Sequence, residues 1–168
     1  MSSIVYLMCS LPSLTFGQVP PMLLDEFNHD AKSQLSVKKF ELLKAINIQG
    51  DNTTKGRLKN ITSMLSEVQQ DLSEIRKSRV QKRQPYLERL PRTVITVNPL
   101  EREKQIMQWQ WEELDSIESN KIFTLIQVIV YKLKLQILCR IHSFNAESGT
   151  QVLASVINPL KNEEDKKW

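Results

Sequence analysis

The sequence predicts a mainly α-helical protein, a bundle of about five to six helices formed as a single domain over residues 1–168. Hydrophobic residues make up 40% of the chain and charged residues 25%, which is enough for a core and unlike a disordered chain. Only four glycines occur, and this argues against a turn-rich β fold and against a glycine-rich phosphate loop. Apolar residues recur at helical spacing through most of the chain, and this periodicity indicates helices.

The first 50 residues contain an ambiguous apolar run and two short predicted helices. Residues 4–11 are apolar and stop at Pro12, and at this length periodicity does not separate a strand from a helix. A loop with Gly and Pro follows, up to Pro21. Pro21 suits the first position of one helix, and Ser36 suits the N-cap of the next.

Residues 48–90 are predicted to form a long amphipathic helix and a basic segment, which together can project from the bundle. The helix carries an a/d seam with spacings of 3, 4, 3, 4 and 3 residues, formed by Leu58, Ile61, Leu65, Val68, Leu72 and Ile75. The seam is short, so packing inside the protein and a coiled coil with a partner are both open.

Five cations follow the seam within eight residues: Arg76, Lys77, Arg79, Lys82 and Arg83. Cations at a helix C-terminus complement the helix dipole, so a solvated helix end explains them. The alternative is an electrostatic docking patch. We therefore take these five cations, together with Leu65 and Leu72 of the seam, as candidate partner contacts.

The centre of the chain combines a short β-branched run with a strong helix start. Residues 93–97 read Thr-Val-Ile-Thr-Val and can form a strand, whose one plausible mate is residues 4–8. Asn98 followed by Pro99 then predicts a capped helix. Trp109 and Trp111 lie on that helix, and their spacing predicts that one is in the core and the other nearer its boundary.

The most hydrophobic helix is predicted to start after Asn120 and to run to Ile141 at the centre of the core. Lys132 and Lys134 interrupt it and are expected to mark its solvent edge. A last helix is predicted around residues 152–157, followed by a charged, frayed tail over residues 161–168.

No pattern of residues indicates catalysis, a cofactor or a metal. The sequence contains no Walker loop, HExxH or GxSxG motif, and its two cysteines, Cys9 and Cys139, are far apart. We therefore expect a protein that is not an enzyme and has no catalytic, cofactor-binding or metal-binding residue. No Lys or Arg precedes the apolar residues 4–11, and residues 122–138 are too polar to span a bilayer, so the expected location is the cytoplasm.

The net charge of +4 is mild and does not by itself indicate nucleic acid. A nucleic-acid-binding protein that uses the basic segment 76–92 is the weaker alternative. Pro85 and Pro91 interrupt the helix that would enter a groove, and Tyr86 is the one aromatic residue there. We expect neither a nucleic acid nor a small-molecule substrate as a partner.

Three blocks of sequence carry a resemblance to a known family. The first block consists of Tyr6, Leu7, Ser10 to Leu14, Phe16, Gly17, Pro20 and Pro21. The second consists of Asn98 to Glu101 with Trp111, and the third of Tyr131 to Leu138 with Phe144 and Gly149. Together they resemble small uncharacterised bacterial proteins encoded in the operons of V-type (V/A-type) ATPases. The resemblance covers both ends of the chain, whereas residues 48–90 depart from the pattern.

The resemblance implies a non-catalytic subunit or accessory protein of a bacterial V-type ATPase. Such a protein would stand in for the C/d-type cap, an all-helical component that couples the central stalk to the membrane rotor ring. It would be cytoplasmic and peripheral to the membrane through the complex, with Arg76 to Arg83 facing acidic side chains of the stalk or ring. An assembly or regulatory factor of the same ATPase is the alternative.

Overall fold

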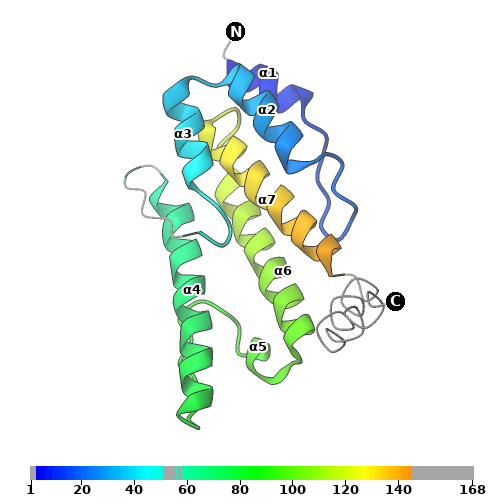
Figure 1. Ribbon diagram of the computed structural model, residues 1–168. Coiled ribbons are helices and arrows are strands. Elements are labelled where there is room, and N and C mark those ends of the chain that lie inside the picture. The colour runs from blue at the N-terminus through cyan, green and yellow to red at the C-terminus, as the bar shows by residue number, and fades with distance from the viewer. Residues whose placement is uncertain (1–2, 51–55, 57, 145–168) are drawn as a thin grey trace, which may run out of the picture.

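The computed structural model describes residues 3–50, 56 and 58–144, and over these residues it is a bundle of helices (Figure 1). The predicted mainly α-helical fold is confirmed. The described helices are α1 Ser3–Ser10, α2 Leu24–Gln34, α3 Val37–Ala45, α4 Lys59–Val80, α5 Thr93–Thr96, α6 Pro99–Glu118 and α7 Leu125–Ser143. The last predicted helix, at residues 152–157, and the tail at 161–168 lie outside the described residues.

Helix α7 forms the centre of the core, as its hydrophobicity predicted. It packs against α6 along its length and against α1, α2 and α3 on its other side (Figure 1). Every residue from Val128 to Leu135 is buried. Helix α4 lies on the far side of α6, which it contacts. The bundle is therefore layered, with α6 and α7 between α4 and the three N-terminal helices.

The expectation that Lys132 and Lys134 form a solvent edge is wrong, because both side chains are buried and satisfied. Lys132 is 3% exposed, and its Nζ donates to the carbonyls of Leu43 and Ile46, both at 2.8 Å, and to Asn47 Oδ1 at 2.9 Å. These carbonyls belong to the C-terminal end of α3, where helical carbonyls have no partner within the helix. The lysine thus satisfies that helix end and joins α7 to α3.

The predicted two-stranded element is also wrong, because residues 4–8 and 93–97 are helical or adjoin a helix and no strand occurs among the described residues. In α1, Ile4 and Leu7 are both buried, a spacing of three that places them on one face of a helix. At the short α5, the Arg102 guanidinium donates to the carbonyls of Val94 at 2.6 Å and Val97 at 3.2 Å. A side chain thus provides the partner that a neighbouring strand would otherwise supply.

The helix starts follow the predicted caps in part. Helix α6 begins as predicted, with Asn98 Oδ1 accepting from the Glu101 N–H at 2.9 Å and Pro99 as its first residue. Ser36 precedes α3 as predicted. Helix α7, however, starts after Thr124 instead of Asn120, and α2 starts at Leu24, three residues beyond Pro21. Phe123 has a φ of 54°, a left-handed conformation that prevents the helix from starting earlier.

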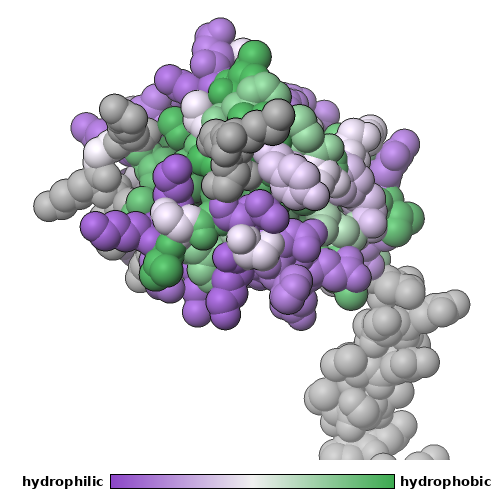
Figure 2. Space-filling view, turned by 90° about the horizontal axis from the view of Figure 1, so that it is seen from above, coloured by the Kyte–Doolittle hydropathy of each residue, from purple (hydrophilic) through white to green (hydrophobic). Residues whose placement is uncertain are grey.

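One end of the bundle exposes apolar side chains. Figure 2 looks onto this end, where several apolar areas lie among polar side chains. The exposed apolar residues of α1, α3 and the α6–α7 turn are Tyr6, Val37, Leu42, Ile122 and Phe123. A hollow of about 1120 Å³ lies among α1, α3, the start of α4 and the α6–α7 turn.

Candidate functional site

The seam of α4 faces the protein's own bundle. Leu65 and Val68 are each 1% exposed, and Leu72 is half-buried against the core. Helix α4 contacts α6. Of the two interpretations that the sequence left open, the structure therefore favours internal packing, and Leu65 is not accessible to a partner in this conformation.

The five cations of the basic segment lie at the C-terminal end of α4, and all of them are exposed. Arg83 forms a two-pronged ion pair with Glu74, and this hydrogen bonding lowers the pKa of Glu74. Arg76, Lys77, Arg79 and Lys82 form no ion pair with any residue that the structure describes. We name these four residues the basic end of α4.

The end of α4 is fixed by a Schellman motif. The Arg83 N–H donates to the Ser78 carbonyl at 3.0 Å, and the Lys82 N–H donates to the Arg79 carbonyl at 3.3 Å. The motif requires a left-handed residue, and Lys82 supplies it with a φ of 52°. Glycine is the usual residue at this position, so Lys82 holds its charge at the helix end at some conformational cost.

A buried carboxylate holds the segment that follows α4. Asp71 is 3% exposed, and its two oxygens accept from the backbone N–H groups of Glu88, Arg89 and Leu90 at 2.8–3.0 Å. Arg89 also pairs with Glu67, one turn before Asp71 on α4. These contacts turn the chain back along α4 and fix the basic end relative to the bundle.

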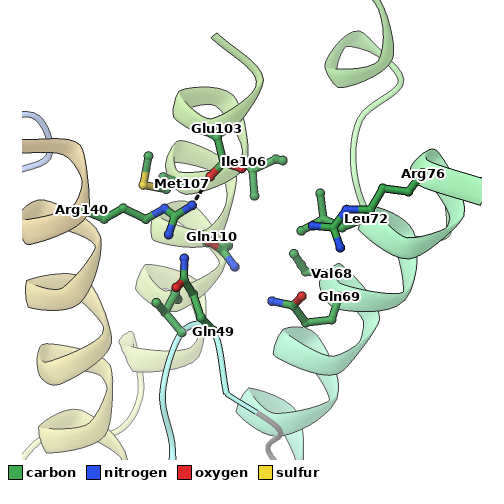
Figure 3. Close-up of a pocket in the computed structure, with 11 residues that line it drawn as sticks. Gln49, Val68, Gln69, Leu72, Arg76, Glu103, Ile106, Met107, Gln110 and Arg140 are labelled. Carbon is green, nitrogen blue, oxygen red and sulfur yellow. Dashed lines mark hydrogen bonds and ion pairs between the residues drawn. The ribbon is translucent and has the colours of Figure 1, made fainter. Parts of the chain in front are cut away.

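A pocket of about 310 Å³ lies where α4, α6 and α7 face the α3–α4 connection (Figure 3). Its walls mix apolar and polar side chains. They are Ile48, Gln49, Val68, Gln69, Leu72, Arg76, Glu103, Ile106, Met107, Gln110 and Arg140. Arg76 therefore belongs both to the basic end of α4 and to this pocket.

The polar groups of the pocket are arranged around one ion pair. Arg140 Nη2 donates to Glu103 Oε2 at 2.9 Å, and in Figure 3 the Arg76 side chain extends from α4 toward the same space. Gln110 is only 4% exposed, yet its amide forms no hydrogen bond with any residue that the structure describes. The Gln110 amide is not among the fully buried side-chain atoms that lack a partner, so it opens onto the pocket and is accessible to solvent or a ligand there.

The three sequence blocks that carry the resemblance meet in space. Tyr131 Oη donates to the Pro12 carbonyl at 2.8 Å, and the rings of Phe16 and Trp111 pack edge to face with centroids 5.5 Å apart. Lys134 Nζ lies 5.5 Å from the centroid of the Trp111 ring. The blocks thus form one packed cluster that joins the N-terminal loop to α6 and α7, and their role in the fold is structural.

The model of one protein family, described as "Protein of unknown function (DUF2764)", matches residues 61–164, more than half of the chain. The chain belongs to the DUF2764 family. The match includes the second and third blocks and α4 from Ile61, whereas the first block, before residue 22, lies outside it. No curated protein and no solved structure matches the chain.

Within the DUF2764 match, the described residues contain no group of three or more His, Cys, Asp or Glu side chains that could hold a metal ion. None of the described helices is long and apolar enough to cross a membrane. The surface features that stand out in this part of the chain are the basic end of α4 and the pocket beside it.

The sequence pointed to Arg76 but not to Gln110, Glu103 and Arg140. These three residues lie on α6 and α7, and nothing local distinguishes them from other polar residues of a helix surface. A weak signal was present for Gln110, because it lies four residues after Ile106 and four before Leu114, which are both buried. This spacing places a polar residue on the apolar face of α6.

Proposed function

We propose that the protein is a non-catalytic component of a bacterial V-type ATPase that acts by binding other subunits. The proposal rests on the resemblance of its three sequence blocks to small proteins encoded in V-type ATPase operons. Within that role, a cap of the C/d type, between the central stalk and the rotor ring, is the position that we infer. A helical protein can transmit force there through contacts alone.

The observation that carries a docking role is the basic end of α4. Arg76, Lys77, Arg79 and Lys82 are exposed and have no ion-pair partner among the described residues. The Schellman motif and Asp71 hold this end in a fixed position. Fixed charges attract an oppositely charged surface and speed association, which suits an acidic surface on the stalk or ring.

Purification of the ATPase from native membranes tests the proposal. The chain carries an affinity tag, and the co-purifying proteins are identified by mass spectrometry. We expect the proteins of the stalk and the rotor ring to co-purify with it in fixed proportion. Recovery with assembly intermediates only would identify an assembly or regulatory factor instead. Absence from both the coupled enzyme and its intermediates would refute the ATPase role.

A charge variant tests the docking surface. The triple substitution Lys77→Gln, Arg79→Gln and Lys82→Gln should release the chain from the complex at a lower salt concentration than the unmodified chain requires, because it removes charges that salt already screens. The control removes three exposed lysines elsewhere, Lys32→Gln, Lys38→Gln and Lys104→Gln. Equal release of both variants would show that net charge matters and the basic end does not.

A further inference from the structure

The pocket between α4, α6 and α7 gathers more hydrogen-bond donors than the protein itself uses. Arg140 has five side-chain N–H donors, and its guanidinium donates to one described residue, Glu103. Arg76 forms no ion pair with a described residue. The amides of Gln49, Gln69 and Gln110 also line the pocket. In Figure 3 these side chains come from three helices and one connection and face a common space.

The charge of the pocket favours an anion. Its ionised side chains are Arg76, Arg140 and Glu103, and Glu103 already neutralises Arg140. One positive charge, that of Arg76, therefore remains without an ion-pair partner among the described residues at the rim. A ligand that carries a single negative charge would leave the pocket neutral, whereas a doubly charged ligand would meet Glu103 with an excess of negative charge.

Gln110 is the second, independent observation that points to a ligand. Its side chain is buried, has no partner among the described residues, and lines the pocket from α6. Its amide is not sealed in the core, so it is available to a ligand in the pocket. A ligand oxygen that accepts from the Gln110 amide would supply the missing partner.

We propose that this pocket binds a carboxylate carried on a short aliphatic chain, with Arg76 and Gln110 donating to its oxygens. The apolar part of the wall, formed by Val68, Leu72, Ile106 and Met107, would receive the chain. A planar carboxylate matches the guanidinium fork, and the pocket volume of about 310 Å³ suits a glutamyl side chain or a free short-chain acid. The proposal does not depend on the ATPase role.

Titration of the isolated, isotope-labelled full chain with butyrate at pH 7, followed by NMR of the Gln and Arg side-chain N–H groups, tests the proposal. We expect saturable shifts at Gln110 and Arg76, with a Kd on the order of 1–10 mM for so small a ligand. Butyramide, which has the same shape without the charge, should give no saturable shift. Equal binding of butyramide or of inorganic phosphate, or no saturation by about 100 mM butyrate, roughly ten times the weakest expected Kd, would overturn the proposal.

Two variants test the residues. Arg76→Gln should weaken butyrate binding about tenfold or more, because it removes the charge partner. Gln110→Leu should weaken butyrate binding several-fold, because it removes the amide that donates to the carboxylate. Arg92→Gln removes an exposed arginine outside the pocket and should leave the Kd unchanged. Unchanged butyrate binding in Arg76→Gln would refute the proposal that this pocket binds a carboxylate through Arg76. If Gln110→Leu fails to fold, the result for Arg76→Gln is sufficient to test the proposal.

The same experiment distinguishes two sources of the carboxylate. N-acetylglutamate N-methylamide represents a glutamyl side chain in a partner protein, and butyrate represents a free acid. Tighter binding of the blocked glutamyl residue than of butyrate would assign the pocket to an acidic side chain of a partner. The reverse order would assign it to a free short-chain acid.

Discussion

Two buried charges of this molecule, those of Asp71 and Lys132, are stabilised mainly by the backbone. Asp71 accepts from three consecutive N–H groups, and Lys132 donates to the carbonyls at the end of α3. Neither forms an ion pair with an oppositely charged side chain among the described residues. Peptide dipoles that are held by the fold can thus stabilise a full charge away from water.

Asp71→Ala is expected to lower the free energy of unfolding by about 2–4 kcal/mol, because it leaves the N–H groups of residues 88–90 without a partner. Denaturation by urea, followed by circular dichroism, measures the change. Asp30→Ala, which removes an exposed carboxylate from α2, should change stability by no more than about 0.5 kcal/mol. Equal losses in the two variants would contradict the role given to Asp71.

At the scale of single residues, apolar burial could be predicted from the sequence better than polar burial. The division of Trp109 and Trp111 was correct, because Trp111 is buried and Trp109 is half-buried. Lys132 and Lys134 were wrongly predicted to be exposed, because the sequence does not show which groups will form hydrogen bonds or ion pairs with a lysine. Lys134 meets Asp115 and Glu118 on α6 at 2.6 Å, and only the packing of α6 on α7 brings them together.

At the scale of the helix, the end of α4 is defined by a strained residue. Lys82 adopts a left-handed conformation at the Schellman position, which costs a residue with a Cβ roughly 1–2 kcal/mol. Glycine would avoid this cost, although it would also gain entropy in the unfolded chain.

Lys82→Gly is therefore expected to raise the free energy of unfolding, by about 0.5–1 kcal/mol after the entropy of the unfolded chain is included. The same substitution at Lys104, an exposed residue in the interior of α6, should lower it by about 1 kcal/mol. Thermal or urea unfolding of the two variants shows whether each substitution raises or lowers the free energy of unfolding. A loss of stability in both would mean that the strain at Lys82 is not relieved by glycine.

Helix types and starts were predictable where a local signal decided them. Asn98 with Pro99 and Ser36 marked the starts of α6 and α3 correctly. The start of α7 was missed by four residues, because the left-handed Phe123 moved the cap to Thr124. The β-branched residues 93–97 indicated a strand, yet the Arg102 side chain from the next helix stabilises a helical turn there.

At the scale of the whole molecule, stability should depend on pH through the lysine that joins α7 to α3. Burial lowers the pKa of Lys132 to about 8, whereas in the unfolded chain it is near 10.5. Between these pKa values the unfolded state binds more protons than the folded state does. The contribution of Lys132 to the free energy of unfolding therefore becomes more favourable as pH rises from about 8 to about 10. Below pH 8 both states are protonated, and the contribution is constant.

Comparison with Lys132→Met isolates this effect from other titrating groups. The free energy of unfolding of the unmodified chain, relative to that of the variant, should rise by about 1–2 kcal/mol between about pH 8 and pH 10. The rise is smaller than the full pKa difference would give, because the carbonyl hydrogen bonds favour the charged lysine. Urea unfolding at several pH values measures it. A difference that stays flat over this range would show that the lysine titrates normally in the folded protein.

The candidate site was predictable only where it is local in sequence. The cations from Arg76 to Arg83 are adjacent in the chain and were found. The pocket needs residues from α4, α6 and α7 to converge, and periodicity does not fix how these helices are placed around one another. The seam of α4 was identified, but its orientation toward α6 depends on the same placement.

Arg76 is shared by the basic end of α4 and the pocket, and this makes two binding events thermodynamically linked. A carboxylate in the pocket would neutralise one of the four cations that face a docking partner. Its binding would therefore reduce the affinity of the basic end for an acidic surface, and by reciprocity a docked partner would reduce the affinity of the pocket for a free acid by the same factor. If the partner itself supplies the carboxylate, the two contacts strengthen each other, since the second forms at the high effective concentration set by the first.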